Sequence, residues 1–163
     1  MQTLKNIFIN GAIILALLFG LTLSATAAGP TFEEVKSLAE KGDSSYQSLL
    51  GSYYREGIGV RQDYAKAFEW SKKSADQGDV FGQFNIGYAY SEGKGVRQDY
   101  AKASEWYKKA AKQNNPFAQF YLGIMYEQGK GVRQNKSIAK EWYGKACDNG
   151  HQDGCDNYKF LNK

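Results

Sequence analysis

Residues 51–64 of this chain read GSYYREGIGVRQDY, and the pattern returns as GYAYSEGKGVRQDY in residues 87–100 and as GIMYEQGKGVRQNK in residues 123–136. Each copy begins 36 residues after the previous one. Three tryptophans keep the same step, namely Trp70, Trp106 and Trp142. A fixed period of this length is typical of stacked supersecondary units, which bury a continuous core only by packing on their neighbours. The sequence therefore predicts a solenoid, and solenoids mostly bind other molecules.

Each copy carries its own helix start and stop signals. Asp63, Asp99 and Asn135 stand just before runs in which alanines and aromatic residues recur at helical spacing, where an Asx side chain accepts from the free N–H groups of a first turn. Gly78 and Asn114 close two of these runs, because glycine and asparagine tolerate the left-handed conformation after a helix. A second helix then ends at a Gly-x-Gly loop, whose glycines permit positive φ. The unit is predicted to be two antiparallel helices joined by a glycine turn.

The predicted fold class is therefore all-α. One further helix opens ahead of the first full copy, where Thr31 and Glu34 have the spacing of a capping box. The expected helices cover residues 31–41, 44–56, 63–77, 80–92, 99–113, 116–128, 135–149 and 152–161.

Residues 1–27 differ from the repeats in composition. Lys5 is followed by an unbroken apolar run at 13–23, and Ala25 and Ala27 then form an Ala-x-Ala site. This order of a cation, an apolar stretch and small residues is typical of a secretory signal peptide, with an uncleaved anchor as the alternative. We expect the mature chain, residues 28–163, to be exported to the periplasm of a bacterium or secreted, without a membrane span after cleavage.

Charge gives little support to a nucleic-acid partner. The formal net charge is +4, but Lys, Arg, Asp and Glu are mixed in every repeat and no block of five or six cations occurs. Mixed charges of this kind are typical of a solvated helix surface. We expect no nucleic acid among the partners.

The repeat resembles the SEL-like repeat (SLR) family, which is related to the tetratricopeptide repeats. The resemblance lies in LGIMYEQGKGV at residues 122–132 and in DYAKASEWYKKAA at residues 99–111, and it extends over about residues 39–158. It implies a right-handed α-solenoid with units at about 44–77, 80–113 and 116–149 and partial end caps at 31–41 and 152–161. It also implies a protein or peptide partner.

The end of the last repeat is similar to the cysteine-rich secreted branch of that family. Cys147 and Cys155 are the two cysteines of the chain, and export would favour their oxidation. The resemblance implies a disulfide that joins the end of one helix to the start of the next. Ala75 and Ala111 occupy the position of Cys147 in the earlier copies, so only the last unit would carry this bond.

Some members of that branch are catalogued as penicillin-binding or β-lactamase-like, which makes such an activity the first alternative. Ser91 and Ser137 each begin a Ser-x-x-Lys match, but Ser-Asp-Asn and Lys-Thr-Gly motifs are missing from the sequence, and both serines are interpreted as surface positions. His151, the one histidine, stands at a helix-cap position and does not complete a Ser/His/Asp set. The Gly-x-Gly loops lack the further residues of a phosphate-binding loop. We expect no catalytic residue, metal site or cofactor.

A surface is the remaining candidate site. When the copies are aligned, two positions on the first helix of each unit change from serine to large apolar residues: Ser48, Phe84 and Phe120 at one, and Ser52, Tyr88 and Ile124 at the other. Helical wheels place them opposite the core. Either they pack first helix against first helix along the stack, or they line a concave aromatic groove for a peptide or partner helix. The predicted binding residues are Phe84, Asn85, Tyr88, Phe120, Tyr121 and Ile124.

The predicted function is therefore an exported scaffold that binds a protein or peptide in the cell envelope. A second alternative is an immunity-type partner of a secreted toxin, which no residue pattern in the chain specifically favours.

Overall fold

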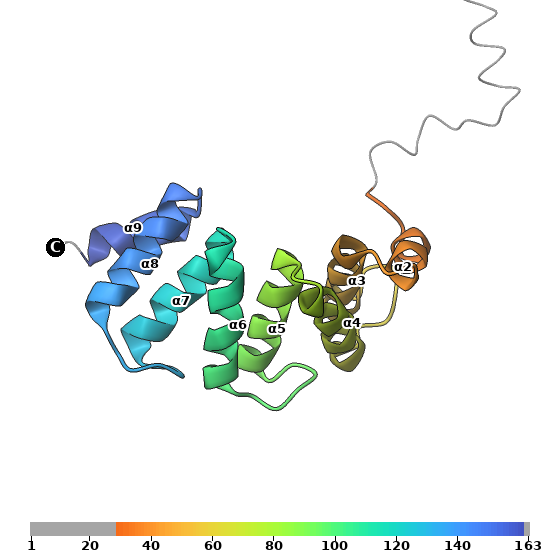
Figure 1. The fold of residues 1–163 in the computed structure, drawn as a ribbon, viewed down its shortest axis with the longest axis horizontal. Coiled ribbons are helices and arrows are strands. Elements are labelled where there is room, and N and C mark those ends of the chain that lie inside the picture. Colours follow the sequence, from red (N-terminus) through yellow and green to blue (C-terminus); the bar gives the residue numbers. More distant parts are fainter. Residues whose placement is uncertain (1–28, 162–163) are drawn as a thin grey trace, which may run out of the picture. The chain divides into compact units, whose positions relative to one another are not determined.

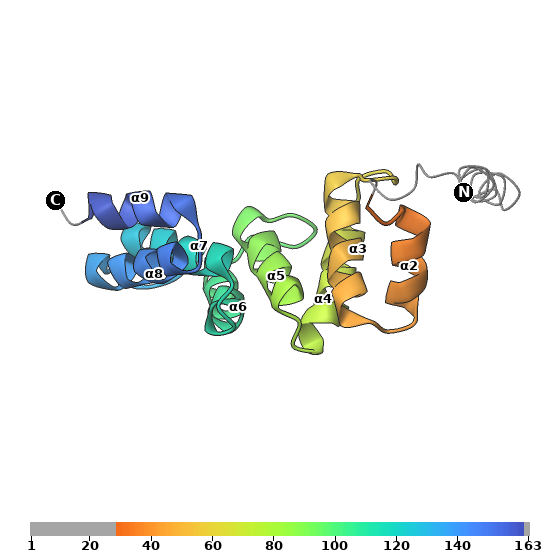
Figure 2. The ribbon, with the colours of Figure 1, turned by 90° about the horizontal axis from the view of Figure 1, so that it is seen from above.

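In the computed structural model, which describes residues 29–161, eight α-helices follow one another and those residues contain no strand (Figures 1 and 2). Their bounds are α2 (Phe32–Glu40), α3 (Ser44–Glu56), α4 (Tyr64–Asp76), α5 (Val80–Glu92), α6 (Tyr100–Lys112), α7 (Pro116–Gln128), α8 (Lys136–Asp148) and α9 (Gln152–Phe160). Each predicted helix is present, with both ends within one residue of the prediction. The all-α solenoid of helical repeats is confirmed. The predicted signal peptide lies outside the described residues.

The predicted caps form as expected. Asp63, Asp99 and Asn135 begin α4, α6 and α8, and each side chain accepts a hydrogen bond of 3.0 Å from the backbone N–H three residues later. Gly78 and Asn114 follow α4 and α6 with φ of 87° and 62°, the left-handed region that ends a helix. Because these signals are local, each helix is delimited by its own sequence.

The second glycine of each Gly-x-Gly loop connects neighbouring repeats. Gly95 and Gly131 have φ of 75° and 68°. A Cβ atom on Gly95 would collide with the backbone of Tyr64, and one on Gly131 would collide with the backbone of Tyr100. The loop of one repeat therefore lies directly on the start of the preceding repeat's second helix, and only glycine fits there.

A glycine also brings the two helices of a repeat together. A Cβ atom on Gly87 of α5 would lie 2.7 Å from Cδ1 of Tyr107 in α6, too close for ordinary van der Waals contact. Gly123 of α7 meets Tyr143 of α8 in the same way. Each tyrosine ring thus lies flat on a side-chain-free patch of the facing helix.

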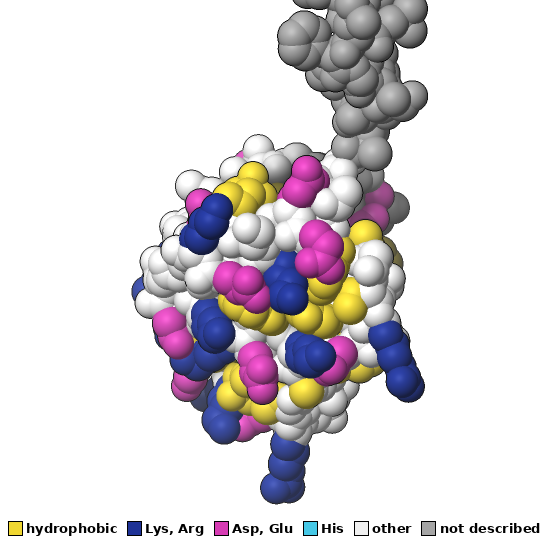
Figure 3. All heavy atoms as spheres, turned by 90° about the vertical axis from the view of Figure 1, so that its right-hand side faces the viewer, with side chains coloured by type: hydrophobic (Ala, Val, Ile, Leu, Met, Phe, Trp, Pro, Cys, Tyr) yellow, Lys and Arg dark blue, Asp and Glu magenta, His cyan; other side chains and the backbone are white. Residues whose placement is uncertain are grey.

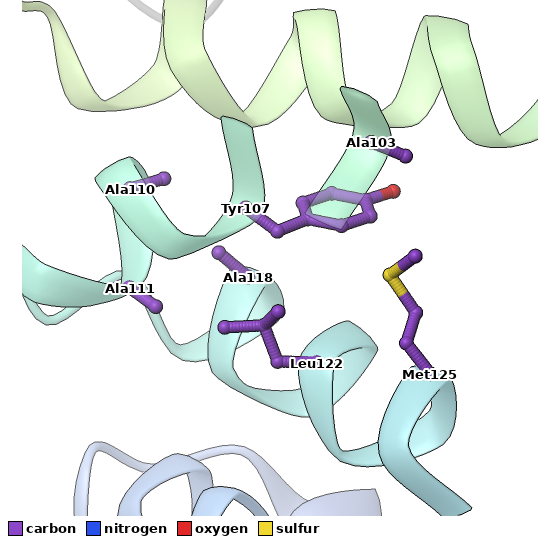
Figure 4. Close-up of a cluster of buried hydrophobic side chains, with 7 residues drawn as sticks. All are labelled: Ala103, Tyr107, Ala110, Ala111, Ala118, Leu122 and Met125. Atoms are coloured by element: carbon purple, nitrogen blue, oxygen red, sulfur yellow. The ribbon is translucent and has the colours of Figure 1, made fainter. Parts of the chain in front are cut away.

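Alanines, larger apolar side chains and the ring of Tyr107 fill the space between α6 and α7 (Figure 4). The cluster consists of Ala103, Tyr107, Ala110, Ala111, Ala118, Leu122 and Met125. Leu122 and its equivalents Leu50 and Ile86 are fully buried. Burial of one such side chain contributes about 1.5–3 kcal/mol.

Amide side chains form a ladder along the stack. The side-chain amide of the residue that ends each second helix donates a hydrogen bond to the side-chain oxygen of a glutamine 30 residues earlier. The pairs are Gln77–Gln47 (2.7 Å), Gln113–Gln83 (2.9 Å) and Asn149–Gln119 (2.9 Å). Gln119 in turn donates from Nε2 to the carbonyl oxygen of Ala111 at 3.2 Å. Since buried polar groups are costly when unpaired, this ladder fixes the register of neighbouring helices.

Helix α2 covers the first end of the stack. Its capping box is present, because the backbone N–H of Glu34 donates to Thr31 Oγ1 at 3.3 Å while the Glu34 carboxylate accepts from the backbone N–H of Thr31 at 2.8 Å. The face of the molecule at this end shows basic and acidic side chains interspersed (Figure 3). Charged side chains on this outer face suit an end of the stack, because no repeat precedes α2 within residues 29–161.

Candidate binding surface

The structure brings three of the predicted binding residues into one chain of aromatic rings. We name this chain the aromatic strip and define it as Phe84, Phe117, Phe120, Tyr121 and His151. Its rings come from α5, α7 and the cap of α9, so that it crosses from one repeat to the next.

Phe84 is the link between α5 and α7. Its ring centroid lies 6.0 Å from those of Phe117 and Tyr121 and 5.8 Å from that of Tyr107. Tyr121 stacks on Tyr107 with centroids 5.3 Å apart and planes 8° apart, and burial raises the pKa of the Tyr121 hydroxyl. Phe84 and Tyr121 remain half-buried, so they pack between repeats and still present part of their surface to solvent.

Phe120 continues the strip toward α9. The ring of His151 stacks on Phe120 with centroids 4.4 Å apart and planes 16° apart, and Tyr143 lies 5.7 Å away on another side. The predicted cap role of His151 is confirmed, because Nδ1 accepts from the backbone N–H of Gly154 at 3.3 Å. The position of its ring over Phe120 was not foreseen, since it depends on how α9 turns back on α7.

Asn85 and Tyr88 belong to a separate polar cluster with Arg55 and Lys94. Asn85 is buried, accepts from Arg55 Nη1 at 2.9 Å and donates to Ser52 Oγ at 3.3 Å. The guanidinium of Arg55 also lies 5.4 Å from the ring of Tyr88. Tyr88 accepts a 3.1 Å hydrogen bond from Lys94, which raises the pKa of that ammonium group. This cluster joins α3 to α5, and the contact of Asn85 with a partner stays a prediction.

Two exposed phenylalanines, one beside the strip and one within it, were missed by the sequence reasoning. Phe81 is 57% exposed and Phe117 is 50% exposed, while Ile124, a predicted anchor, is half-buried. Phe81 and Phe117 stand three residues before Phe84 and Phe120, a spacing that puts them on the same helix face. That spacing was the signal that could have identified them.

An apolar hollow of about 540 Å³ lies between α3 and the start of α5. It is lined by Ser45, Ser48, Leu49 and Ser52 of α3 with Asp79, Val80 and Phe81. The serines are the residues that replace Phe81, Phe84 and Tyr88 in the first repeat, so the hollow exists because the first copy has small side chains there.

The first and second helices of the later repeats differ in their number of charged residues. Glu92 is the one charged residue of α5 and Glu127 the one charged residue of α7, whereas α6 carries five charges between Lys102 and Lys112. Lysines of the second helices lie over tryptophans, as Lys109 does over Trp106 at 3.7 Å. The first-helix surface is consequently apolar and nearly uncharged.

The serines of the two Ser-x-x-Lys matches have no catalytic geometry. Ser91 is 7% exposed and bonds to the carbonyl of Tyr88 at 2.9 Å and to the hydroxyl of Tyr107 at 3.2 Å. The expectation of a surface position was therefore wrong for Ser91, because a tyrosine from α6 covers it. Ser137 is exposed as expected. Neither serine bonds to a lysine within residues 29–161.

The cysteines form the predicted disulfide between the end of α8 and the first turn of α9, with Cα atoms 4.5 Å apart. In the described part of the chain, no group of three or more His, Cys, Asp or Glu side chains is placed to hold a metal ion. None of the helices from α2 to α9 is long and apolar enough to cross a bilayer.

Comparison with known proteins identifies the repeat. The family model of the Sel1 repeat matches residues 44–79, 80–115 and 116–151. Among solved structures, a Sel1 repeat protein from Oxalobacter formigenes is 31% identical with a TM-score of 0.70 over 74% of this chain. The c5321 protein, a protective antigen of uropathogenic Escherichia coli with an SLR fold, is 37% identical with a TM-score of 0.72 over 77% of this chain.

Cysteine-rich protein B of Helicobacter pylori is 26% identical, with a TM-score of 0.62 over 78% of this chain and 97% of its own length. By contrast, the matched region spans 48% of the Oxalobacter protein and 27% of c5321. No curated protein is significantly similar to the chain.

Proposed function

The chain belongs to the Sel1 repeat family, and we propose that it is an exported scaffold that binds a protein or peptide partner on the first-helix surface of α5 and α7. The Sel1 repeat is a scaffold typical of protein–protein interaction. The observation that carries the proposal is the exposure of Phe81 and Phe117 on helices that carry one charge each. Exposed aromatic side chains that continue into a larger apolar surface often mark a protein-interaction site.

The surface suits an amphipathic helix or an extended peptide with large apolar side chains. Phe81 and Phe117 supply two separate aromatic contacts, and the hollow beside Ser48 and Phe81 can accept a bulky side chain. Phe84, Tyr88, Phe120, Tyr121 and Ile124 would form its half-buried floor. The polar contact assigned to Asn85 would require exchange of its bonds to Arg55 and Ser52.

Three observations support export to the cell envelope of a bacterium. Residues 1–27 have the composition of a signal peptide, and the structure contains the Cys147–Cys155 disulfide, which is typical of an oxidising compartment. The cysteine-rich relative from Helicobacter pylori has a similar fold. Export is tested by mass spectrometry of the protein recovered from a periplasmic fraction, which should show a chain that lacks residues 1–27. A protein with an intact N-terminus in the cytoplasmic fraction would contradict export.

The binding proposal is best tested at the exposed phenylalanines, because Phe84 and Phe120 also pack against the core. We expect Phe81→Ser with Phe117→Ser to leave the helical circular dichroism and the melting temperature nearly unchanged. A partner captured from the envelope fraction and identified by mass spectrometry should bind this double variant at least about tenfold more weakly in calorimetry.

Ile58→Ser provides the matched control, since Ile58 is 49% exposed but lies in a Gly-x-Gly loop instead of on the first-helix surface. The control variant should bind as the wild type does. Equal affinity of the double variant and the wild type for the identified partner would place the binding site elsewhere.

A further inference from the structure

The loop that follows each first helix contains one residue whose recurrence the fold does not explain. In the loop between α5 and α6, Gly93 caps α5, and Gly95 lies on the preceding repeat. Gln98 donates from Nε2 to the carbonyl oxygen of Ser91 at 2.7 Å, and Asp99 caps α6. Val96 is half-buried. Each of these residues has a structural role in the loop. Arg97 is the residue to which the fold assigns no such role.

Arg97 and its equivalents Arg61 and Arg133 are exposed, and within residues 29–161 they make no hydrogen bond, ion pair or ring contact. The fourth arginine behaves differently, because Arg55 bonds to Asn85 and Glu56 and lies over Tyr88. Many lysines are also engaged, as Lys102 is with Asp99 at 3.7 Å. Three guanidinium groups at one position of three repeats are thus exposed and have no partner among the described residues.

A hollow lies beside each of the last two arginines. The one at Arg97 measures about 340 Å³ and is lined by Tyr90, Val96, Arg97, Gln98, Asp99 and Lys102. The one at Arg133 measures about 430 Å³, and its lining includes Lys108, Tyr126, Val132, Arg133, Asn135 and Ile138. Their loops lie along the same lower edge in Figure 1.

The two hollows differ in charge in a way that favours anions at the second. Beside Arg97, the carboxylate of Asp99 offsets one of the two cations. Beside Arg133, the equivalent cap is the neutral Asn135, and Lys108 adds a second cation whose ammonium lies 5.8 Å from the ring centroid of Tyr126. The wall of this hollow is apolar at Val132 and Ile138.

We propose that this loop edge is a second docking surface, which takes an acidic segment of a protein partner. Carboxylates of the segment pair with the guanidinium groups of Arg97 and Arg133, and apolar residues between them enter the hollow beside Val132. Arginine is suited to this role because its planar fork binds a carboxylate through two parallel hydrogen bonds.

An acidic peptide fits these observations better than a nucleic acid does. The loop arginines occur once per repeat, and Asp63 and Asp99 stand two residues after Arg61 and Arg97. A continuous phosphate backbone would meet those carboxylates, whereas nucleic-acid sites present an uninterrupted basic stripe. A peptide can place its carboxylates at the arginines and its apolar residues between them.

The surface is distinct from the one in the proposed function. Phe81 and Phe117 lie at the start of α5 and α7, while the arginine loops follow the ends of those helices. A helix of 13 residues separates the two surfaces by roughly 18 Å. Failure of one proposal therefore leaves the other intact.

The test uses a fluorescent peptide in which glutamate alternates with leucine, and the same peptide with glutamine in place of glutamate. Fluorescence anisotropy with the purified protein should show binding of the glutamate peptide that weakens as salt rises. Arg97→Glu with Arg133→Glu should weaken it at least about tenfold. Arg97→Gln with Arg133→Gln serves as the second variant in case charge reversal disturbs folding, and it should weaken binding in the same direction.

The matched control is Lys41→Glu with Lys112→Glu, which changes net charge equally at two exposed cations outside the loop edge. It should retain the affinity of the wild type to within about twofold, as should Phe81→Ser with Phe117→Ser. Equal weakening by the lysine control, equal binding of the glutamine peptide, or tighter arginine-dependent binding of a single-stranded oligonucleotide would each overturn the proposal.

Discussion

Cys155 occupies the position that Gln119 holds one repeat earlier, and its disulfide to Cys147 replaces the hydrogen bond from Gln119 Nε2 to the carbonyl oxygen of Ala111. Both connections span eight residues and tie the end of a second helix to the start of the next first helix. Gln47 makes the same bond to Ala39 at 3.2 Å. The last repeat thus has a covalent form of a contact that Gln47 and Gln119 make non-covalently at the equivalent positions.

This relationship predicts what removal of the disulfide would do. Cys147→Ala with Cys155→Gln restores the residues of the inner repeats but removes the cross-link, and we expect the free energy of unfolding to fall by about 2–3 kcal/mol. Chemical denaturation with and without a thiol reductant measures the effect. The wild type should lose stability in reductant, whereas the double variant should not respond, and a response of equal size in both would show that another process is involved.

The close approach of α5 to α6 predicts an unusual effect of alanine in a helix. Gly87→Ala should lower the free energy of unfolding by about 1–3 kcal/mol, because the new methyl group would overlap the ring of Tyr107. Intrinsic propensity alone would favour alanine by about 1 kcal/mol. Thermal and chemical denaturation of the purified variant shows whether the steric overlap or the helix propensity has the larger effect on stability.

Gly144→Ala is the matched control, since Gly144 is also a helical glycine that faces a tyrosine. Its Cβ atom would lie 3.2 Å from Cε2 of Tyr158, an exposed ring that would need to shift by only a few tenths of an ångström. This variant should be neutral or more stable by up to about 1 kcal/mol. A Gly87→Ala protein as stable as the wild type would show that α5 and α6 can separate without cost.

The sequence predictions were accurate where the interacting residues are close in sequence and failed where they belong to different helices. Asp63, Asp99 and Asn135 could be assigned as caps because the groups that they bond lie three residues away. Ser91 was misplaced because the residue that covers it, Tyr107, belongs to the next helix. The repeat allows the copies to be aligned in sequence, but the alignment does not show which faces of neighbouring helices pack together.

The candidate site shows the same limit. The variable positions Phe84 and Phe120 could be found by comparing copies, yet their contacts with Tyr121 and His151 depend on how α5, α7 and α9 lie together. Arg97 was overlooked for the opposite reason. It is invariant among the copies, so comparing them does not single it out, and only the structure shows that it makes no hydrogen bond, ion pair or ring contact with the described residues.

Burial of two tyrosines predicts a loss of stability at alkaline pH. Desolvation raises the pKa of the Tyr107 and Tyr143 hydroxyls above the ordinary tyrosine value. The folded state therefore favours the neutral phenols, and this contribution is complete below about pH 10 and is lost as the pH rises further. Denaturant titrations across this range should show a shallower alkaline decline for Tyr107→Phe than for the wild type, and an unchanged decline would assign it to other groups.

The cap of α6 predicts the opposite dependence in acid. The backbone N–H of Lys102 lowers the pKa of the Asp99 carboxyl below its ordinary value of 3.8, so the stabilising contribution is present above that value and is lost as the pH falls through the lowered pKa. Asp99→Asn should keep the cap, as Asn135 does in the next repeat, and should match the wild type at neutral pH. Thermal melts between neutral pH and pH 3 should show a smaller acid-induced decrease in melting temperature for this variant. Parallel acid profiles for the two proteins would mean that protonation of the Asp99 carboxyl does not change the stability of the protein.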